Sequence, residues 1–317
     1  MPLRTPISRA FRASRAWLFL CACAPALSFG PDSRFALVWG PSAVCAQAGP
    51  YPLVIGLPAT ARYAGLANAG VAVHGDAGAL FVNPAGISTM RHAGIEATYH
   101  FSHDQGIEGT AAGAFRIKQF SFGGGAHYLR LDPSSPNADN LMTMGTVVYR
   151  YAIFAVGASG KYISIEDTTG DTRRTATGDV GVLVPFFDLF AIGASFQNIG
   201  HKRVSGGPID LPHSSHLGIV FNFTDPQETW VLRAIWEKVW TEGLDSRSKL
   251  ALEAGAQVGG AFVTLRAGTG ERNPATKQSD SAVGASVGFR RLAFDWAYQK
   301  RTALGGDVQR IGVRFTP

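Results

Sequence analysis

The stretch from Ala93 to Phe101 reads AGIEATYHF, and apolar residues occupy every second position of it. Ile95 and Tyr99 belong to the apolar set, whereas Glu96 and His100 fall in the intervening small or polar set. Because successive side chains of a β-strand point to opposite faces, this segment has one apolar face and one polar face. Such a strand suits a sheet that separates lipid from a wet interior.

The same two-residue period recurs along the rest of the chain. Near the other end, Leu292, Phe294 and Trp296 alternate with Ala293 and Asp295. A tilted membrane strand needs about 9–11 residues, which most of the segments approach. We count fourteen of them, near residues 93–101, 109–117, 120–131, 142–151, 154–163, 178–186, 190–198, 216–223, 229–240, 250–258, 261–268, 282–289, 292–300 and 308–315. The pattern predicts an all-β chain that forms a 14-stranded antiparallel transmembrane β-barrel.

The connections between these segments alternate in length. Every second connection spans about 2 to 5 residues, and the others span about 7 to 17. In outer-membrane barrels the periplasmic connections are tight turns and the external ones are longer loops. Closure of the sheet also pairs every backbone group, as hydrocarbon demands. A soluble sandwich gives no reason for such alternation.

Composition agrees with a barrel and argues against a helical membrane bundle. The chain has 317 residues, of which 46% are hydrophobic and 16% charged, and it contains 38 glycines. Its body contains no run of about 18 apolar residues, which a transmembrane helix would need. Aromatic residues near the segment ends suit the girdles at the two membrane interfaces.

Residues 1–48 are predicted to be a leader that directs export. They hold five arginines against one aspartate, and all three cysteines, Cys21, Cys23 and Cys45. A basic region, an apolar core at 16–24 and the small-residue site Val44-Cys45-Ala46 are typical of a secretory signal. Cleavage near Ala46 or Ala48, and an internal start that shortens the leader, both remain open. The cysteine-free body excludes a disulfide scaffold or a cysteine nucleophile there.

Residues 59–92 lack the period of two and read ATARYAGLANAGVAVHGDAGALFVNPAGISTMRH. This stretch is rich in alanine and glycine, as suits a segment packed in a confined lumen. Pro84 restricts Asn83 to extended conformations and Gly86 lets the chain turn, so a compact turn is expected at 83–86.

Three runs of this stretch resemble FadL-type outer-membrane proteins, most closely their shorter PorV/PorQ-type relatives: residues 61–66, 69–73 and 76–86. The resemblance implies that residues 49–92 form an N-terminal hatch inside a barrel made by residues 93–317. It implies that Asp76, Asn83, Pro84, Ala85 and Gly86 serve gating or architecture. These two roles are not separable in the sequence.

The resemblance implies two alternative functions. FadL-type proteins pass hydrophobic small molecules, such as long-chain fatty acids, through the bacterial outer membrane, and this passive transport is the first expectation. The alternative is a PorV-like component of type IX secretion that binds protein partners. In both cases the chain is exported through the periplasm, contacts outer-membrane lipid, and binds neither nucleic acid nor a cofactor.

The polar faces of the segments are predicted to line the lumen. Mixed charges there more often form a structural network than a substrate path. They include Glu96, His100, Arg116, His127, Lys161, Asp179, Arg233, Glu253, Arg266, Arg290, Asp295, Arg310 and Arg314. No catalytic set or carboxylate pair stands out, so an enzyme is not expected. His213 and His216 lack a nearby acid or cysteine at suitable spacing, so no metal site is predicted.

Overall fold

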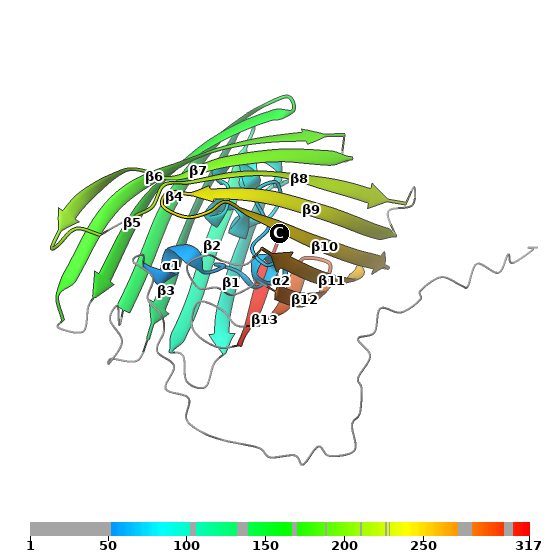
Figure 1. Cartoon of the computed structure of the whole chain (residues 1–317). Coiled ribbons are helices and arrows are strands. Elements are labelled where there is room, and N and C mark those ends of the chain that lie inside the picture. Colours follow the sequence, from blue (N-terminus) through cyan, green and yellow to red (C-terminus); the bar gives the residue numbers. More distant parts are fainter. Residues whose placement is uncertain are drawn as a thin grey trace, which may run out of the picture. The chain divides into compact units, whose positions relative to one another are not determined.

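The computed structural model describes residues 52–101, 106–131, 139–166, 170–187, 189–209, 211–225, 227, 229–271, 281–300 and 307–317. Fourteen strands in these ranges close into one antiparallel barrel, in which sequence neighbours pair and β1 pairs with β14 (Figure 1). The predicted fold class is therefore confirmed. The predicted leader, residues 1–48, lies outside the described residues.

Each strand falls on one of the predicted segments. They are β1 (Ala93–Phe101), β2 (Ile107–Ile117), β3 (Phe120–Arg130), β4 (Asp139–Tyr151), β5 (Phe154–Glu166), β6 (Thr172–Phe186), β7 (Phe190–Ser205), β8 (Ser214–Thr224), β9 (Trp230–Thr241), β10 (Arg247–Val258), β11 (Ala261–Gly270), β12 (Ser281–Phe289), β13 (Leu292–Lys300) and β14 (Val308–Phe315). We call the end with the connections at 118–119, 152–153 and 259–260 the turn end, and the opposite end the loop end.

Several strands are longer than predicted, and the extra residues lie at the loop end. β6 begins at Thr172 instead of residue 178, and β7 continues to Ser205 instead of residue 198. Backbone pairing continues there, although the side chains no longer alternate between apolar and polar. The predicted strict alternation of connection lengths is therefore wrong in detail, because the loop-end connection at 242–246 is no longer than the turn-end connection at 225–229.

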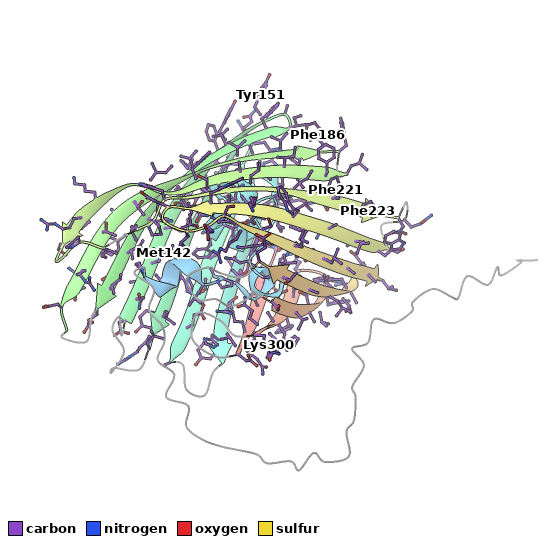
Figure 2. The ribbon with its side chains drawn as sticks, viewed as in Figure 1. Met142, Tyr151, Phe186, Phe221, Phe223 and Lys300 are labelled. Atoms are coloured by element: carbon purple, nitrogen blue, oxygen red, sulfur yellow. The ribbon has the colours of Figure 1, made fainter. Side chains whose placement is uncertain are left out.

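The outer wall of the barrel is apolar. In β13, Phe294 is 58% exposed, whereas the next residue, Asp295, is 3% exposed. Tyr151, Phe221 and Phe223 project from the outer surface (Figure 2). A soluble monomer rarely exposes a contiguous apolar surface beyond a few hundred Å². This wall is the lipid-facing surface of an outer-membrane-type barrel.

Helices in the described part of the chain are short. None has both the length and the apolar character needed to cross a bilayer.

Residues 52–92, called the hatch below, fill the interior of the barrel (Figure 1). The hatch contains two short α-helices, α1 (Leu53–Gly56) and α2 (Ala61–Gly65), and two 3₁₀-helices, η1 (Ala77–Phe81) and η2 (Pro84–Thr89). Hatch side chains such as Leu80 and Ile87 share one buried core with wall side chains such as Leu183 and Val220.

Glycines of the wall let the hatch backbone approach closely. A Cβ atom built on Gly193 would lie 2.2 Å from the carbonyl oxygen of Val71, and one on Gly268 would lie 2.4 Å from the backbone of Leu66. Both glycines therefore stand where the hatch touches the sheet, and any larger residue would push it away.

The hatch runs from the loop end to the turn end. Val54 of α1 packs with Met142 and Ile163, which lie in the loop-end halves of β4 and β5. At the other extreme, the Met90 side chain lies against Gly94, next to the end of β14. The hatch therefore extends along the lumen from one end of the barrel to the other.

Candidate functional site: the lumen and its hatch

The two 3₁₀-helices of the hatch are capped by Asp76 and Asn83, two of the residues predicted to serve gating or architecture. Asp76 Oδ1 accepts a hydrogen bond from Ala79 N at 2.9 Å and caps η1. Asn83 Oδ1 accepts one from Ala85 N at 3.0 Å and caps η2, with Pro84 in the first turn. A proline there loses nothing, because its missing N–H would have had no helical partner.

Asn83 also joins the hatch to the wall. Its Nδ2 donates to Val71 O at 2.7 Å within the hatch and to Val182 O of β6 at 3.1 Å. Gly181 makes room for this contact, because a Cβ atom there would lie 2.0 Å from Asn83 Oδ1. The fully buried Asn83 thus both shapes the hatch and attaches it to the sheet.

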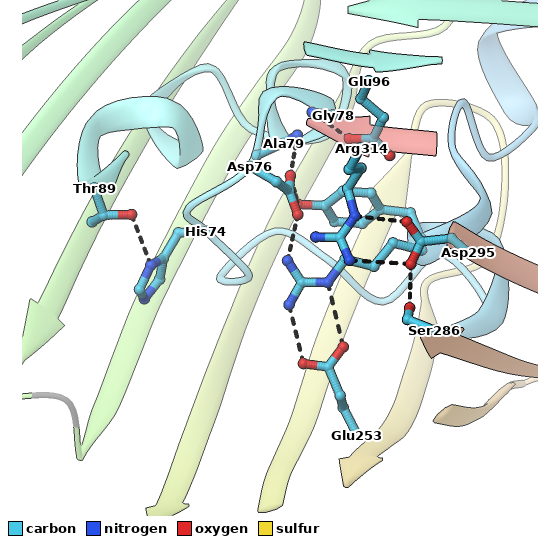
Figure 3. Close-up of polar contacts among 12 residues, drawn as sticks. His74, Asp76, Gly78, Ala79, Thr89, Glu96, Glu253, Ser286, Asp295 and Arg314 are labelled. Atoms are coloured by element: carbon cyan, nitrogen blue, oxygen red, sulfur yellow. Dashed lines mark hydrogen bonds and ion pairs between the residues drawn. The ribbon is translucent and has the colours of Figure 1, made fainter. Parts of the chain in front are cut away.

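A second attachment is ionic and centres on Arg62 of α2. Arg62 donates to Glu253 of β10, from Nη2 at 3.1 Å and from Nε at 3.3 Å, and it also pairs with Asp76. Glu253 receives a further bond from Arg266 at 2.6 Å and one from Arg233. Asp76 of the hatch and Glu253 of the wall are thus both linked to Arg62 (Figure 3).

Burial and neighbouring charges together shift the pKa values of two hatch side chains, Arg62 and Tyr63. Burial by itself lowers the pKa of Arg62, but the carboxylates of Glu253 and Asp76 raise it well above its usual value. Burial raises the pKa of the Tyr63 phenol well above its usual range, and neighbouring Asp76 adds to the rise. Arg62 is therefore a permanent cation, and Tyr63 a neutral donor to Asp76 Oδ1 at 3.3 Å.

Glu237 of β9 is a third attachment, and the sequence interpretation missed it. Its Oε2 accepts hydrogen bonds from the backbone N–H groups of Gly70, at 2.6 Å, and Val71, at 2.9 Å. Its Oε1 lies 2.8 Å from Nδ1 of His216. The segment that holds Glu237 alternates poorly between apolar and polar residues, so the period of two did not assign this side chain to the lumen.

Near the loop end, buried charges pair within the wall. The Glu108 carboxylate forms an ion pair with Nη2 of Arg310 at 2.9 Å. The same carboxylate lies 3.2 Å from Nδ1 of His100 and 2.9 Å from Nε2 of His127. Lys161 pairs with Asp179 at 2.8 Å and also donates to Asn198. Glu108 and Asn198 were not among the predicted lumen residues.

Most of the predicted polar residues face the interior in the structure. The buried ones are Glu96, His100, His127, Lys161, Asp179, Glu253, Arg266, Asp295 and Arg310. Arg233 and Arg314 are partly buried, and Arg116 is half-exposed and donates to Lys118 O at 2.8 Å. The prediction for Arg290 is wrong, because this residue lies exposed in the turn after β12 with its guanidinium over Phe289.

The two mouths of the lumen differ in character. Near the loop end, Ile209 and Leu211 of the segment after β7 pack with Val54, Met142 and Ile163 in one buried apolar cluster. Towards the turn end lies a cavity of about 560 Å³. Charged side chains that line the cavity are Arg62, Arg150, Arg233, Glu253, Arg266 and Arg314.

These features define a class of protein: a transmembrane β-barrel whose lumen is occupied by its own N-terminal hatch. Neither the profiles of protein families nor the curated proteins gave a match to the sequence. Solved structures do match. The Ralstonia pickettii toluene transporter TbuX covers 83% of this chain and 99% of its own, with a TM-score of 0.58 and 13% identity.

Two further structures agree. The Pseudomonas putida toluene transporter TodX has a TM-score of 0.54 and 12% identity, covering 80% of this chain and 96% of its own. A Pseudomonas aeruginosa FadL homologue has a TM-score of 0.51 and 13% identity, covering 81% and 98%. The chain therefore has a FadL-type fold.

Proposed function

We propose that this protein is an outer-membrane channel for passive movement of hydrophobic small molecules, exported with the help of its leader. The observation that carries the proposal is the buried apolar cluster near the loop end, in which Val54 of the hatch packs with side chains of the wall. An apolar solute can leave water there without losing hydrogen bonds. The FadL-type fold, shared with two toluene transporters, supports the same assignment.

In this proposal, passage requires the hatch to shift relative to the wall. The contacts of Arg62, Asn83 and Glu237 hold the hatch in the closed arrangement. Polar contacts of this kind can exchange for water in a lumen, whereas the hydrogen-bonded barrel wall stays intact. No energy source is needed, because the solute moves down its own gradient.

A reversible crosslink between hatch and wall tests the proposal. A Cβ atom on Gly312 of β14 would lie 3.3 Å from Cβ of Ala61 in α2, close to the usual separation of about 3.5–4.5 Å in a disulfide. The body of the chain has no cysteine of its own, and the single-cysteine variants control for the three cysteines of the leader, so an effect that only Ala61→Cys with Gly312→Cys shows comes from this pair. Uptake of radiolabelled toluene by cells or proteoliposomes is the measurement.

We expect the oxidised double variant to lose toluene uptake and to regain it after reduction with dithiothreitol. Each single cysteine variant, oxidised in the same way, should behave as the unmodified protein. Equal uptake in the crosslinked and reduced forms would refute hatch movement. Absence of toluene uptake by the unmodified protein, relative to empty vesicles, would count against a channel for such molecules.

The alternative of a PorV-like secretion component rests on the resemblance in residues 61–86 and remains a prediction. Affinity purification of the intact protein from its own membranes distinguishes the two functions. Stoichiometric recovery of secretion-system proteins, together with no solute uptake, would favour the alternative.

A further inference from the structure

We propose that the turn-end cavity is a binding site for a small organic oxyanion, a molecule with carboxylate or phosphate groups. This inference goes beyond the proposed passage of hydrophobic molecules and does not depend on it. The cavity holds about 560 Å³, within the range of about 300–1,000 Å³ that is usual for small-molecule sites.

The lining of the cavity is strongly biased in charge. Five guanidinium groups face it, against the single carboxylate of Glu253. Arginine presents planar pairs of N–H donors that match carboxylate and phosphate oxygens. Other polar side chains complete the lining: His74, Thr89, Thr229, Gln257 and Thr264.

Acids behind the lining hold the guanidinium groups without covering them all. Asp295 pairs with Arg314 at 2.6 Å and lies within 3.4 Å of Arg266. Asp76 pairs with Arg62. Glu96 accepts a hydrogen bond from Gly78 N at 3.1 Å and lies near Arg314 (Figure 3). The arginines are thus held in position, and a ligand meets preorganised donors.

Arg233 and Arg150 both line the cavity, and both already have partners in the structure. The Arg233 side chain is 35% exposed, although it pairs with Glu253 and donates to Asn222 Oδ1 at 3.1 Å. Arg150 reaches the cavity from the end of β4, where its Nε donates to Ala152 O at 3.2 Å. The five arginines outnumber the nearby acids Glu253, Asp76, Asp295 and Glu96, and low-dielectric walls concentrate the potential of this positive excess in the cavity. An anion is the ligand that this potential attracts.

The binding site is also coupled to the hatch. Arg62 belongs to the hatch, and it faces the same cavity as its wall partner Glu253. An oxyanion that binds Arg233 and Arg266 competes with Glu253 for these donors. Occupancy would therefore change the contact between Glu253 and Arg62.

Isothermal titration of the full-length protein in neutral detergent tests the site. Inorganic phosphate and succinate are the anionic probes, and succinamide is a neutral probe of matched shape. We expect at least one anion to bind, more weakly as salt is raised, and succinamide not to bind. Arg233→Gln and Arg150→Gln should each raise the Kd about tenfold or more, since a hydrogen bond to a charged group contributes about 1.5–3 kcal/mol.

Arg116→Gln is the matched control. Arg116 and Arg150 both lie two residues before a turn residue of positive φ, Lys118 or Ala152, and each donates Nε to the carbonyl of that residue. Only Arg150 lines the cavity. If Arg233→Gln disturbs folding, as judged by heat-modifiability on gels, Arg150→Gln decides the outcome.

Three results would overturn the proposal. One is that neither anion binds at millimolar concentration. Another is that succinamide binds as tightly as succinate. The last is that Arg116→Gln weakens anion binding as much as Arg150→Gln does. Because the assay measures binding to purified protein, failure of toluene uptake would leave these results unchanged.

Discussion

Replacement of Asn83 by alanine should release the hatch while leaving the barrel intact. The Asn83 side chain makes three hydrogen bonds, to Val71 O, Val182 O and Ala85 N, and it is fully buried. Alanine would leave all three backbone groups without this partner. A buried polar group that loses its partner costs about 1–3 kcal/mol. Water can reach part of the emptied space and satisfy some of these groups, so we expect Asn83→Ala to lower the stability of the docked hatch by about 3–6 kcal/mol in total.

Native-state hydrogen exchange, read by mass spectrometry, measures this quantity directly. A loss of about 3–6 kcal/mol corresponds to exchange faster by about 10²–10⁴ for amides that open when the hatch undocks. We expect this acceleration in residues 69–90. Amides of β12 and β13 should keep their protection, because the loss of a hatch contact removes no bond from the ladder between these strands.

The control is Asn68→Gly, in the same hatch. Asn68 has a φ of 58°, which glycine adopts freely, and its Oδ1 accepts no hydrogen bond. This variant should change exchange of residues 69–90 by about tenfold at most. The reasoning would be refuted if Asn83→Ala left hatch exchange unchanged, or if it accelerated the strands and the hatch equally.

Three further predictions concern the wall and one buried phenol. Gly193→Ala should displace the hatch and lower its stability by about 1–3 kcal/mol, because the added Cβ would collide with Val71 O. Gly145→Ala, whose added Cβ would have nothing within 4 Å, is the control and should leave hydrogen exchange of the hatch unchanged. Leu252→Arg, on the outer face, should lower the unfolding free energy by up to about 2–4 kcal/mol in lipid vesicles, and an unchanged urea midpoint would contradict a lipid-facing position. Tyr63 has a raised pKa, so it contributes full stability below the pKa of an unfolded tyrosine, about 10, and loses that contribution as pH rises through the folded pKa. The absorbance difference at about 295 nm between the unmodified protein and Tyr63→Phe should therefore show no step near pH 10, and a step there would contradict its burial.

The sequence by itself determined the barrel. A period of two is a local property, because each side chain takes the face opposite to its neighbour whatever the rest of the chain does. Leu292, Phe294 and Trp296 therefore identified the lipid face of β13, and Asp295 its lumen face, before any pairing was known. The same logic failed where membrane no longer constrains the side chains, as in the extended ends of β6 and β7.

The compact turn at residues 83–86 was also predictable from the sequence, because an asparagine followed by a proline and a glycine has few backbone options. The residues that this turn and the rest of the hatch contact were not predictable. Asn83 donates a hydrogen bond to Val182, which is 99 positions away in the sequence, and Arg62 donates one to Glu253, which is 191 positions away.

Only the closed sheet brings those groups together, since pairing of β1 with β14 sets which lumen residues face which part of the hatch. The cavity lined by arginines arises in the same way. Its charged lining residues come from the hatch and from strands β4, β9, β10, β11 and β14, and none of them lies next to another in the sequence. The local pattern of side chains thus fixed the wall, whereas the contents and charge of the lumen were decided by the way that the wall closes around the hatch.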